Sequence, residues 1–292
     1  MAGANLVSQA EQKLKGGFLS FLSGGPKYDE AAELYVQAAN QFKISKEWKE
    51  AANCYEQSAF CAQQSGSTTE QADCYNEAGN VLKKVSTQAA IEQYEKAIAI
   101  YSSNGRFSQS GKLLLAIAEL TESERVARVA EVRSFYQRAS EMFDLDDYSK
   151  SNYTKCILKV AEYAAKDGEL EQAIQIFETE GEKALSSNLL QYGAKEHFLR
   201  AGILHLVMGD TVTINLALEK YKNIDPRFGG SRECELLEAL SQAYEEREID
   251  MFVEKLSEYD NMTKLDAWKT EFLVKVKDAM QPSMNGNAID LS

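Results

Sequence analysis

The sequence predicts an all-α protein in which helical hairpins stack into a twisted solenoid sheet that leads into a C-terminal helical bundle. Two observations support this prediction. A tyrosine followed three positions later by a small residue recurs at Tyr35, Tyr55, Tyr75 and Tyr94, at intervals of 20, 20 and 19 residues, and again at Tyr136. Only three prolines occur in 292 residues, so long stretches carry no helix breaker, and residues that favour helices fill these stretches.

The repeat length indicates how these helices associate. An aromatic residue and a small residue three positions apart place a knob beside a notch on one helix face. About 20 residues make one helix and a turn, and two such units make a hairpin that buries its apolar face only by stacking on neighbours. The run from Gly168 to Phe177 follows the second helix of a tetratricopeptide hairpin, whereas the other repeats fit more loosely. The fold is therefore tetratricopeptide-like, and it favours a binding surface over a catalytic pocket.

The elements are expected in a simple order. A short amphipathic helix at 5–15 and an apolar loop make an N-terminal segment at 1–27. Hairpin helices fill 28–186, at 28–43, 46–65, 67–84, 88–103, 107–121, 124–143, 148–167 and 169–184. Less similar helices form the bundle at 187–281, at 188–208, 212–223, 229–246, 248–259 and 264–280. A polar tail, expected to be flexible, occupies 282–292.

The loop after the first helix is unusual because glycine pairs flank four large apolar residues, and surface loops are ordinarily polar. These residues are Phe18, Leu19, Phe21 and Leu22. They could pack under the first hairpin, or they could insert shallowly into a lipid interface or a partner groove.

The charge of the chain is strongly negative but unevenly distributed. The formal net charge of −13 and the pI of about 4.8 argue against nucleic-acid binding, which needs a basic surface. Residues 80–170 carry 13 basic and 13 acidic side chains, whereas residues 231–292 carry 7 basic and 14 acidic ones. This asymmetry indicates two electrostatically different partners.

The sequence carries no recognisable catalytic or metal-binding motif. The cysteines form no CxxC pair, and reduced thiols in the core of a cytoplasmic protein are expected. His197 and His205 are expected to be structural, and no zinc spacing or phosphate-binding loop occurs. We expect neither enzymatic activity nor a cofactor, metal or small-molecule substrate. No apolar stretch is long enough to span a bilayer, and no signal peptide is apparent.

Several strings in order along the chain resemble the alpha-type soluble NSF attachment proteins. The strings are Gly105-Arg106-Phe107, Lys155-Cys-Ile-Leu-Lys-Val-Ala161, Ser231-Arg-Glu-Cys-Glu-Leu236 and Glu258-Tyr-Asp260 with Leu265-Asp-Ala-Trp268. The resemblance implies an adaptor that binds assembled four-helix SNARE complexes. It also implies that the adaptor recruits and stimulates the hexameric AAA ATPase NSF, which then disassembles the SNAREs. It further implies a cytoplasmic protein that associates peripherally with membranes.

The resemblance also implies which residues make contact. The SNARE-binding positions match Arg106, Lys112, Lys155 and Lys159, with Lys83 and Lys84 as further candidates that could equally be ordinary solvated lysines. The NSF-binding positions match Asp210, Glu245, Glu246, Glu248, Asp250, Asp290 and Leu291. The membrane-contact positions match Phe18, Leu19, Phe21 and Leu22. The chain departs from the family before Leu291, where family members carry several consecutive acids and this chain carries Asn287-Ala-Ile-Asp290. An alternative function is a tetratricopeptide-like scaffold that binds peptide tails.

Overall fold

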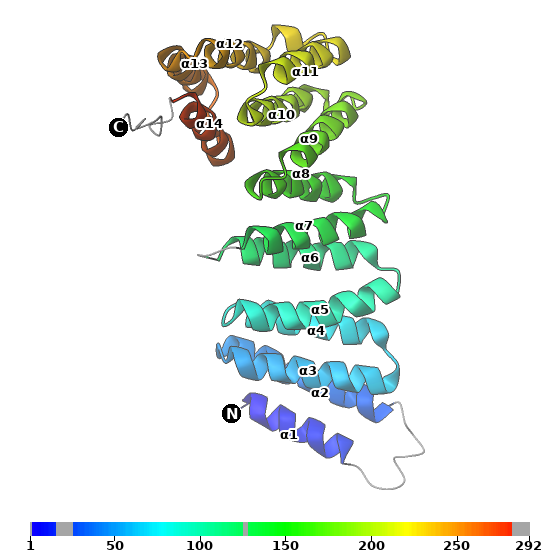
Figure 1. The fold of residues 1–292 in the computed structure, drawn as a ribbon. Coiled ribbons are helices and arrows are strands. Elements are labelled where there is room, and N and C mark those ends of the chain that lie inside the picture. Colours follow the sequence, from blue (N-terminus) through cyan, green and yellow to red (C-terminus); the bar gives the residue numbers. More distant parts are fainter. Residues whose placement is uncertain (1, 16–25, 125–127, 282–292) are drawn as a thin grey trace, which may run out of the picture. The chain divides into compact units, whose positions relative to one another are not determined.

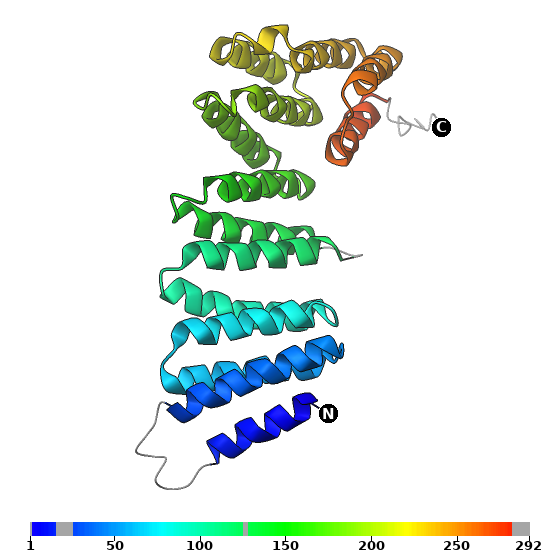
Figure 2. The same cartoon turned by 180° about the vertical axis from the view of Figure 1, so that it is seen from behind.

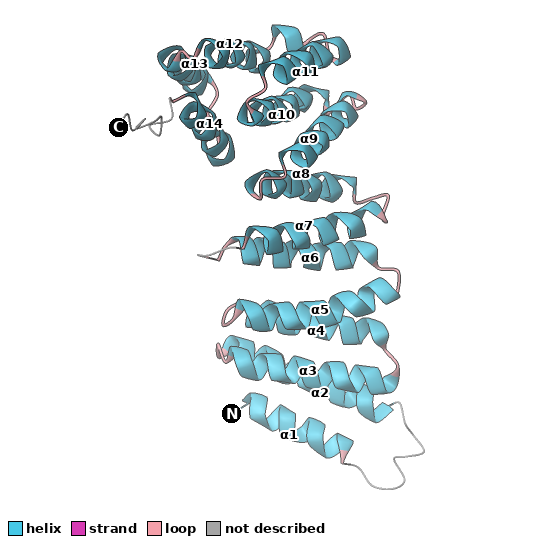
Figure 3. Cartoon of the chain, in the orientation of Figure 1, coloured by secondary structure: helices cyan, strands magenta, loops and turns pink. Residues whose placement is uncertain are grey.

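The computed structural model describes residues 2–15, 26–124 and 128–281. In this part of the chain every regular element is a helix and no strand occurs (Figure 3). The predicted all-α fold is therefore confirmed. Packing divides the chain into two compact units, residues 1–156 and 157–292.

The first unit is a row of helices in which each helix from α1 to α7 packs on the next (Figure 1). Its helices are α1 (Ala2–Leu14), α2 (Pro26–Ile44), α3 (Trp48–Ser65), α4 (Thr68–Leu82), α5 (Thr87–Ser103), α6 (Phe107–Glu122), α7 (Val129–Asp144) and the start of α8 (Lys150–Lys166). Helix ends fall within two residues of the expected positions for 28–184, except at the start of α7. Successive helices run antiparallel, so the turns alternate between two edges of the row (Figure 2).

The repeated tyrosines take part in the contacts between helices, except Tyr75, which is only half-buried. Tyr35, Tyr55, Tyr94 and Tyr136 are at most 4 % exposed, and the small residue three positions after each of them is also buried. A Cβ built on Gly79 of α4 would lie 2.5 Å from the Tyr94 ring, so the ring requires a glycine there. The knob-and-notch interpretation of the repeat therefore holds at these positions.

The hydroxyls of these tyrosines follow a second regularity. Tyr55 donates to Asn40 Oδ1 at 3.1 Å, and Tyr94 donates to Asn80 Oδ1 at 2.9 Å. In both pairs the acceptor lies 14 or 15 residues earlier, near the end of the preceding helix. The hydroxyl of each buried tyrosine is thus hydrogen-bonded at the margin of the core, which avoids the free-energy cost of an unsatisfied hydroxyl.

The second unit is a bundle around a central helix. Its helices are the rest of α8, α9 (Leu170–Leu185), α10 (Ala194–Met208), α11 (Thr211–Ile224), α12 (Arg232–Glu246), α13 (Ile249–Met262) and α14 (Ala267–Met280). Helix α10 packs against α9, α11, α12 and α14, which explains why residues on all its sides are buried. One helix expected at 188–208 begins only at Ala194, because Ser187 and Asn188 bond to nearby backbone and side-chain groups and hold a turn.

A polar network ties α8, α10 and α14 together within this unit. The Arg200 guanidinium bonds Glu162 at 2.9 Å, Glu196 at 3.2 Å and Asp266 at 2.7 Å. Its carbon also lies 5.1 Å from the centre of the Trp268 ring. The cation is thus satisfied on its edge by carboxylates and on its face by an aromatic ring.

The cysteines are buried as free thiols, as expected from the sequence. They are Cys54, Cys61, Cys74, Cys156 and Cys234. Burial raises the pKa of Cys61 to about 11, so this thiol stays protonated and unreactive at neutral pH.

Candidate functional site

Two exposed lysines predicted to bind an acidic partner lie on neighbouring helices of the first unit. Lys112 is exposed on α6 and Lys155 is exposed on α8. Lys155 Nζ lies 2.7 Å from Glu119 Oε1 of α6, which places the two helix faces side by side. Since Lys112 and Glu119 are two helical turns apart, they share one face of α6. We call the surface formed by Lys112, Glu119 and Lys155 the α6–α8 face.

The turn before α8 belongs to the same region. Asp146 accepts hydrogen bonds from Ser149 Oγ at 2.6 Å and from the Tyr148 backbone N–H at 3.2 Å. Ser149 Oγ in turn lies 3.0 Å from Ser108 Oγ on α6. The pKa of Asp146 is held below its ordinary value, mainly by the Ser149 hydrogen bond and also by the charge of Lys112. The acid therefore stays ionised and offsets part of the positive charge near Lys112.

The remaining predicted cations fall in different places. Arg106 is half-buried and precedes the first residue of α6, at the edge of the first unit that also holds the α7–α8 turn. Lys83 and Lys84 are exposed at the end of α4, at the opposite edge. The 17 residues of α5 separate these two edges by roughly 25 Å. The structure therefore brings Lys112 and Lys155 together but not Lys83 and Lys84 with them.

Lys159 is one turn after Lys155 along α8 but belongs to the second unit. Its Nζ lies 3.1 Å from Glu162 Oε2, and the same carboxylate binds Arg200. Lys159 is half-buried. It is therefore joined to the network around Arg200, in contrast to the more exposed Lys155.

The predicted acidic residues of the second unit gather at two turns that touch. Asp210 caps the start of α11 and accepts from the backbone N–H of Val212 at 3.0 Å. A Cβ built on Gly209 would lie 2.9 Å from the Tyr244 hydroxyl, so the α10–α11 turn lies against the end of α12. The exposed acids of the α12–α13 region follow directly: Glu245, Glu246, Glu248 and Asp250. We call Asp210 and these four residues the acidic cluster.

Six predicted contact residues lie outside the described residues. They are Phe18, Leu19, Phe21, Leu22, Asp290 and Leu291.

One exposed apolar segment of the second unit was missed by reasoning from the sequence. Leu189, Leu190 and Tyr192 are 84 %, 58 % and 71 % exposed in the connection between α9 and α10. Tyr192 lines a cleft together with Lys195 and Arg227, and the Arg227 guanidinium lies 5.7 Å from the tyrosine ring. The signal in the sequence was the Leu-Leu pair inside a polar break in the helical pattern.

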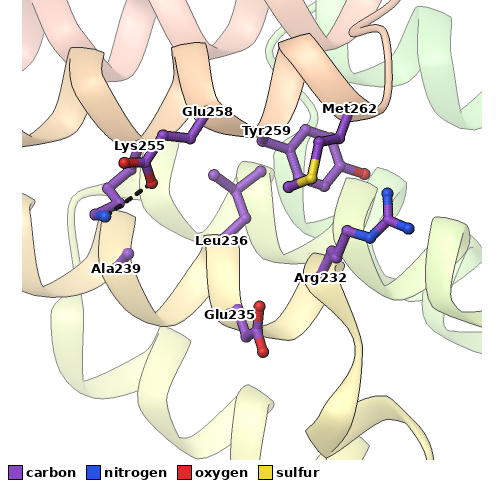
Figure 4. Close-up of a pocket in the computed structure, with 8 residues that line it drawn as sticks. All are labelled: Arg232, Glu235, Leu236, Ala239, Lys255, Glu258, Tyr259 and Met262. Carbon is purple, nitrogen blue, oxygen red and sulfur yellow. Dashed lines mark hydrogen bonds and ion pairs between the residues drawn. The ribbon is translucent and has the colours of Figure 1, made fainter.

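A second cleft in this unit lies between α12 and α13 (Figure 4). Its floor includes Leu236, and Lys255 pairs with Glu258 at 2.8 Å at one end. Arg232 and the ring of Tyr259 lie at the other end. Glu235, Ala239 and Met262 complete the lining of this cleft.

The described residues contain no group of three or more His, Cys, Asp or Glu side chains placed to hold a metal ion. Among the same residues, no helix combines the length and the apolar character needed to cross a membrane.

Comparisons with known proteins identify relatives over almost the whole chain. A family model described as soluble NSF attachment protein, SNAP, matches residues 1–281. An "Alpha-soluble NSF attachment protein" of Vitis vinifera is 39 % identical over 279 residues, covering 96 % of this chain and 94 % of that protein. The protein of the same name from Mus musculus is also 39 % identical, covering 94 % of each chain. A "Probable vesicular-fusion protein sec17 homolog" of Schizosaccharomyces pombe is 31 % identical, covering 94 % and 95 %.

Proposed function

Because the chain belongs to the soluble NSF attachment protein family, we propose that it is an adaptor that binds assembled SNARE complexes and recruits and stimulates NSF. The match over residues 1–281 and the relatives named for NSF attachment and vesicular fusion support this proposal. In this role the chain performs no covalent chemistry, and NSF supplies the energy of ATP hydrolysis. The protein acts in the cytoplasm and associates peripherally with membranes.

The α6–α8 face binds the SNARE bundle. The observation that carries this assignment is that Lys112 and Lys155 are both exposed on neighbouring helices of an otherwise acidic protein. The surface of a zippered SNARE bundle is acidic, so exposed cations complement it. Glu119 holds Lys155 only through an exposed ion pair, which contributes little, so an acidic partner can displace it.

Other contacts extend this binding. Arg106 lies at the edge of the first unit that also holds the α7–α8 turn, while Lys83 and Lys84 serve as separate contacts at the opposite edge. Lys159 pairs with Glu162, which also binds Arg200, and adds positive charge. In the second unit, Tyr192 with Leu189 and Leu190 offers apolar area beside Lys195, a combination suited to the mixed surface of a helical bundle.

The acidic cluster binds basic surface on NSF, and Asp290 and Leu291 complete this contact. The tail carries Asn287-Ala-Ile-Asp290 where the family resemblance implies several consecutive acids, so its coupling to ATP hydrolysis is weaker or differently tuned. Phe18, Leu19, Phe21 and Leu22 give weak membrane attachment. Each such side chain contributes about 1.5–3 kcal/mol when fully buried, which becomes useful once a SNARE complex already holds the protein at the bilayer.

A bridging experiment tests this proposal. Purified NSF is passed over immobilised, fully assembled SNARE complex with and without the protein, and bound NSF is measured. We expect retention of NSF only when the protein is present and only on the assembled bundle. Retention of the protein by isolated SNARE tail peptides, with no preference for the bundle, would favour a peptide-binding scaffold instead. Retention of NSF without the protein would contradict the adaptor role.

A further inference from the structure

The outward side of α11 exposes apolar residues directly beside the acidic cluster. Val212 and Leu216 are one helical turn apart and are 66 % and 62 % exposed. Met208, at the end of α10 and four residues before Val212, is 42 % exposed. Because residues four apart share a helix face, Val212 and Leu216 form one continuous apolar surface. We call Val212 and Leu216 the α11 apolar patch.

The core of the second unit does not need these side chains. Helix α11 packs through its opposite face, where Ile214, Leu218 and Tyr221 are at most 3 % exposed. The Tyr221 ring stacks on Phe198 at 4.6 Å between centroids. The buried face therefore anchors α11, and Val212 and Leu216 are left open to solvent.

The charges around the patch are mainly negative. Asp210 immediately precedes α11, and exposed Glu219 lies on the same side of the helix as Leu216. Among the cations of α11, Lys220 binds Glu178 at 2.7 Å and Glu182 at 3.2 Å, and Lys222 pairs with Glu238.

The acids of the α12–α13 turn add to the negative charge around the patch, and Arg247 is the cation inside that turn. They lie nearby because Tyr244 packs against Gly209, one residue before Asp210. An apolar patch bordered by acids therefore complements a surface with an apolar site bordered by Lys or Arg.

We propose that the α11 apolar patch is a contact surface for NSF, next to the acidic cluster. This inference rests on the proposed function, in which the cluster binds NSF. The two parts of the surface have different tasks. The exposed acids steer the encounter and set its salt dependence, whereas burial of Val212 and Leu216 sets the lifetime of the complex.

Binding kinetics test this division. The change is Val212→Thr with Leu216→Gln, which keeps similar side-chain sizes and removes apolar surface on the solvent side. The matched control is Leu145→Gln with Val274→Thr, two exposed apolar residues on the α7–α8 turn and on α14. A charge variant, Glu245→Gln with Glu246→Gln, completes the set. The full-length chain is immobilised and purified NSF is the analyte, at two salt concentrations.

We expect the patch variant to dissociate at least about tenfold faster, with an unchanged salt dependence of association. The charge variant should associate more slowly and lose part of its salt dependence, and the control should match the unchanged chain. Dissociation of the patch variant within twofold of the unchanged chain would overturn the inference while leaving NSF recruitment intact. Absence of NSF binding by the unchanged chain would instead contradict the proposed function.

Sedimentation distinguishes a competing occupant of the patch. If the patch were an interface between two copies of the chain, the unchanged protein would self-associate with rising concentration and the patch variant would not. That result would overturn the assignment to NSF. We expect the same sedimentation behaviour for both proteins.

Discussion

Reversal of charge at Lys112 and Lys155 should abolish stable binding of assembled SNARE complexes without unfolding the protein. The perturbation is Lys112→Glu with Lys155→Glu. Both lysines are exposed, and the Lys155–Glu119 pair is about half-exposed on each side, at 52 % and 50 %. Loss of such a pair and its replacement by like charges costs about 1–2 kcal/mol of unfolding free energy. A decrease of only a few degrees in Tm is therefore expected.

The expected loss of binding is larger than the loss of stability. Two reversals at an electrostatic contact remove two attractions and add two repulsions, for about 2–3 kcal/mol, or roughly 30- to 150-fold in affinity. Retention on immobilised SNARE complex, measured at low and at high salt, checks this value. The difference between variant and unchanged protein should narrow at high salt, because mobile ions screen exposed charges.

Two control variants separate local from general effects. Lys264→Glu with Lys275→Glu changes the net charge equally on the second unit, and it should leave SNARE binding nearly unchanged. Glu119→Lys with Lys155→Glu rebuilds the ion pair in reverse, and it should recover both stability and most of the binding. Unchanged binding by Lys112→Glu with Lys155→Glu would refute the assignment of the α6–α8 face.

Four further predictions concern other parts of the molecule. Gly79→Ala should lower the free energy of unfolding, measured in urea, by about 1–3 kcal/mol, because the added Cβ would meet the Tyr94 ring. The control Gly193→Ala should leave this free energy nearly unchanged, because the space around Gly193 is open. Burial alone would raise the pKa of Glu178, but the nearby His205 ring, with Nε2 3.7 Å away, and hydrogen bonds from Lys220 and Tyr221 lower it from 4.5 to about 2. Stability should therefore fall as the pH drops from about 4.5 towards 2, and Glu178→Gln should flatten that part of the pH profile. Phe18→Ser with Phe21→Ser should reduce flotation with liposomes and slow disassembly only of membrane-anchored SNAREs; an equal loss on soluble SNAREs would indicate a role in folding. Leu291→Ala should still bridge SNAREs and NSF but fail to support ATP-driven disassembly, and normal disassembly would place this role elsewhere.

Local patterns were enough to predict most of the helices. The spacing of Tyr94 and Ala97 predicted one face of α5, and Gly105 predicted the end of that helix. In the structure Gly105 has the left-handed conformation, at φ 70°, that favours glycine at this position. The close approach of Gly79 to Tyr94 could not be predicted, because it depends on how two helices pack.

Long-range pairs give a structural role to some residues of the strings that carry the family resemblance. Asp266, which the sequence offered only as part of a family resemblance, caps α14 by accepting from the Lys269 N–H at 2.8 Å and also binds Arg200. The neighbouring Trp268 donates its indole N–H to the Glu162 carbonyl at 3.2 Å. These contacts join residues up to 106 positions apart, so no local pattern could predict them.

The candidate site was predictable only in part for the same reason. The resemblance named Asp210 and Glu245 separately, but the packing of Gly209 on Tyr244 brings them into one cluster. In contrast, Lys83 and Arg106 appeared in one set of candidates, and the length of α5 keeps them apart. Which exposed charges share a surface is decided by tertiary packing, not by spacing along the chain.

The most direct measurement of the adaptor function is a reconstituted disassembly reaction. Fluorescently labelled SNARE complex is incubated with NSF, Mg²⁺ and ATP, with and without the protein, and dissociation of the four helices is followed in real time. Disassembly should require both the protein and hydrolysable ATP, and the protein carrying Lys112→Glu and Lys155→Glu should be strongly impaired. Equal rates of disassembly with and without the protein would contradict the proposed function.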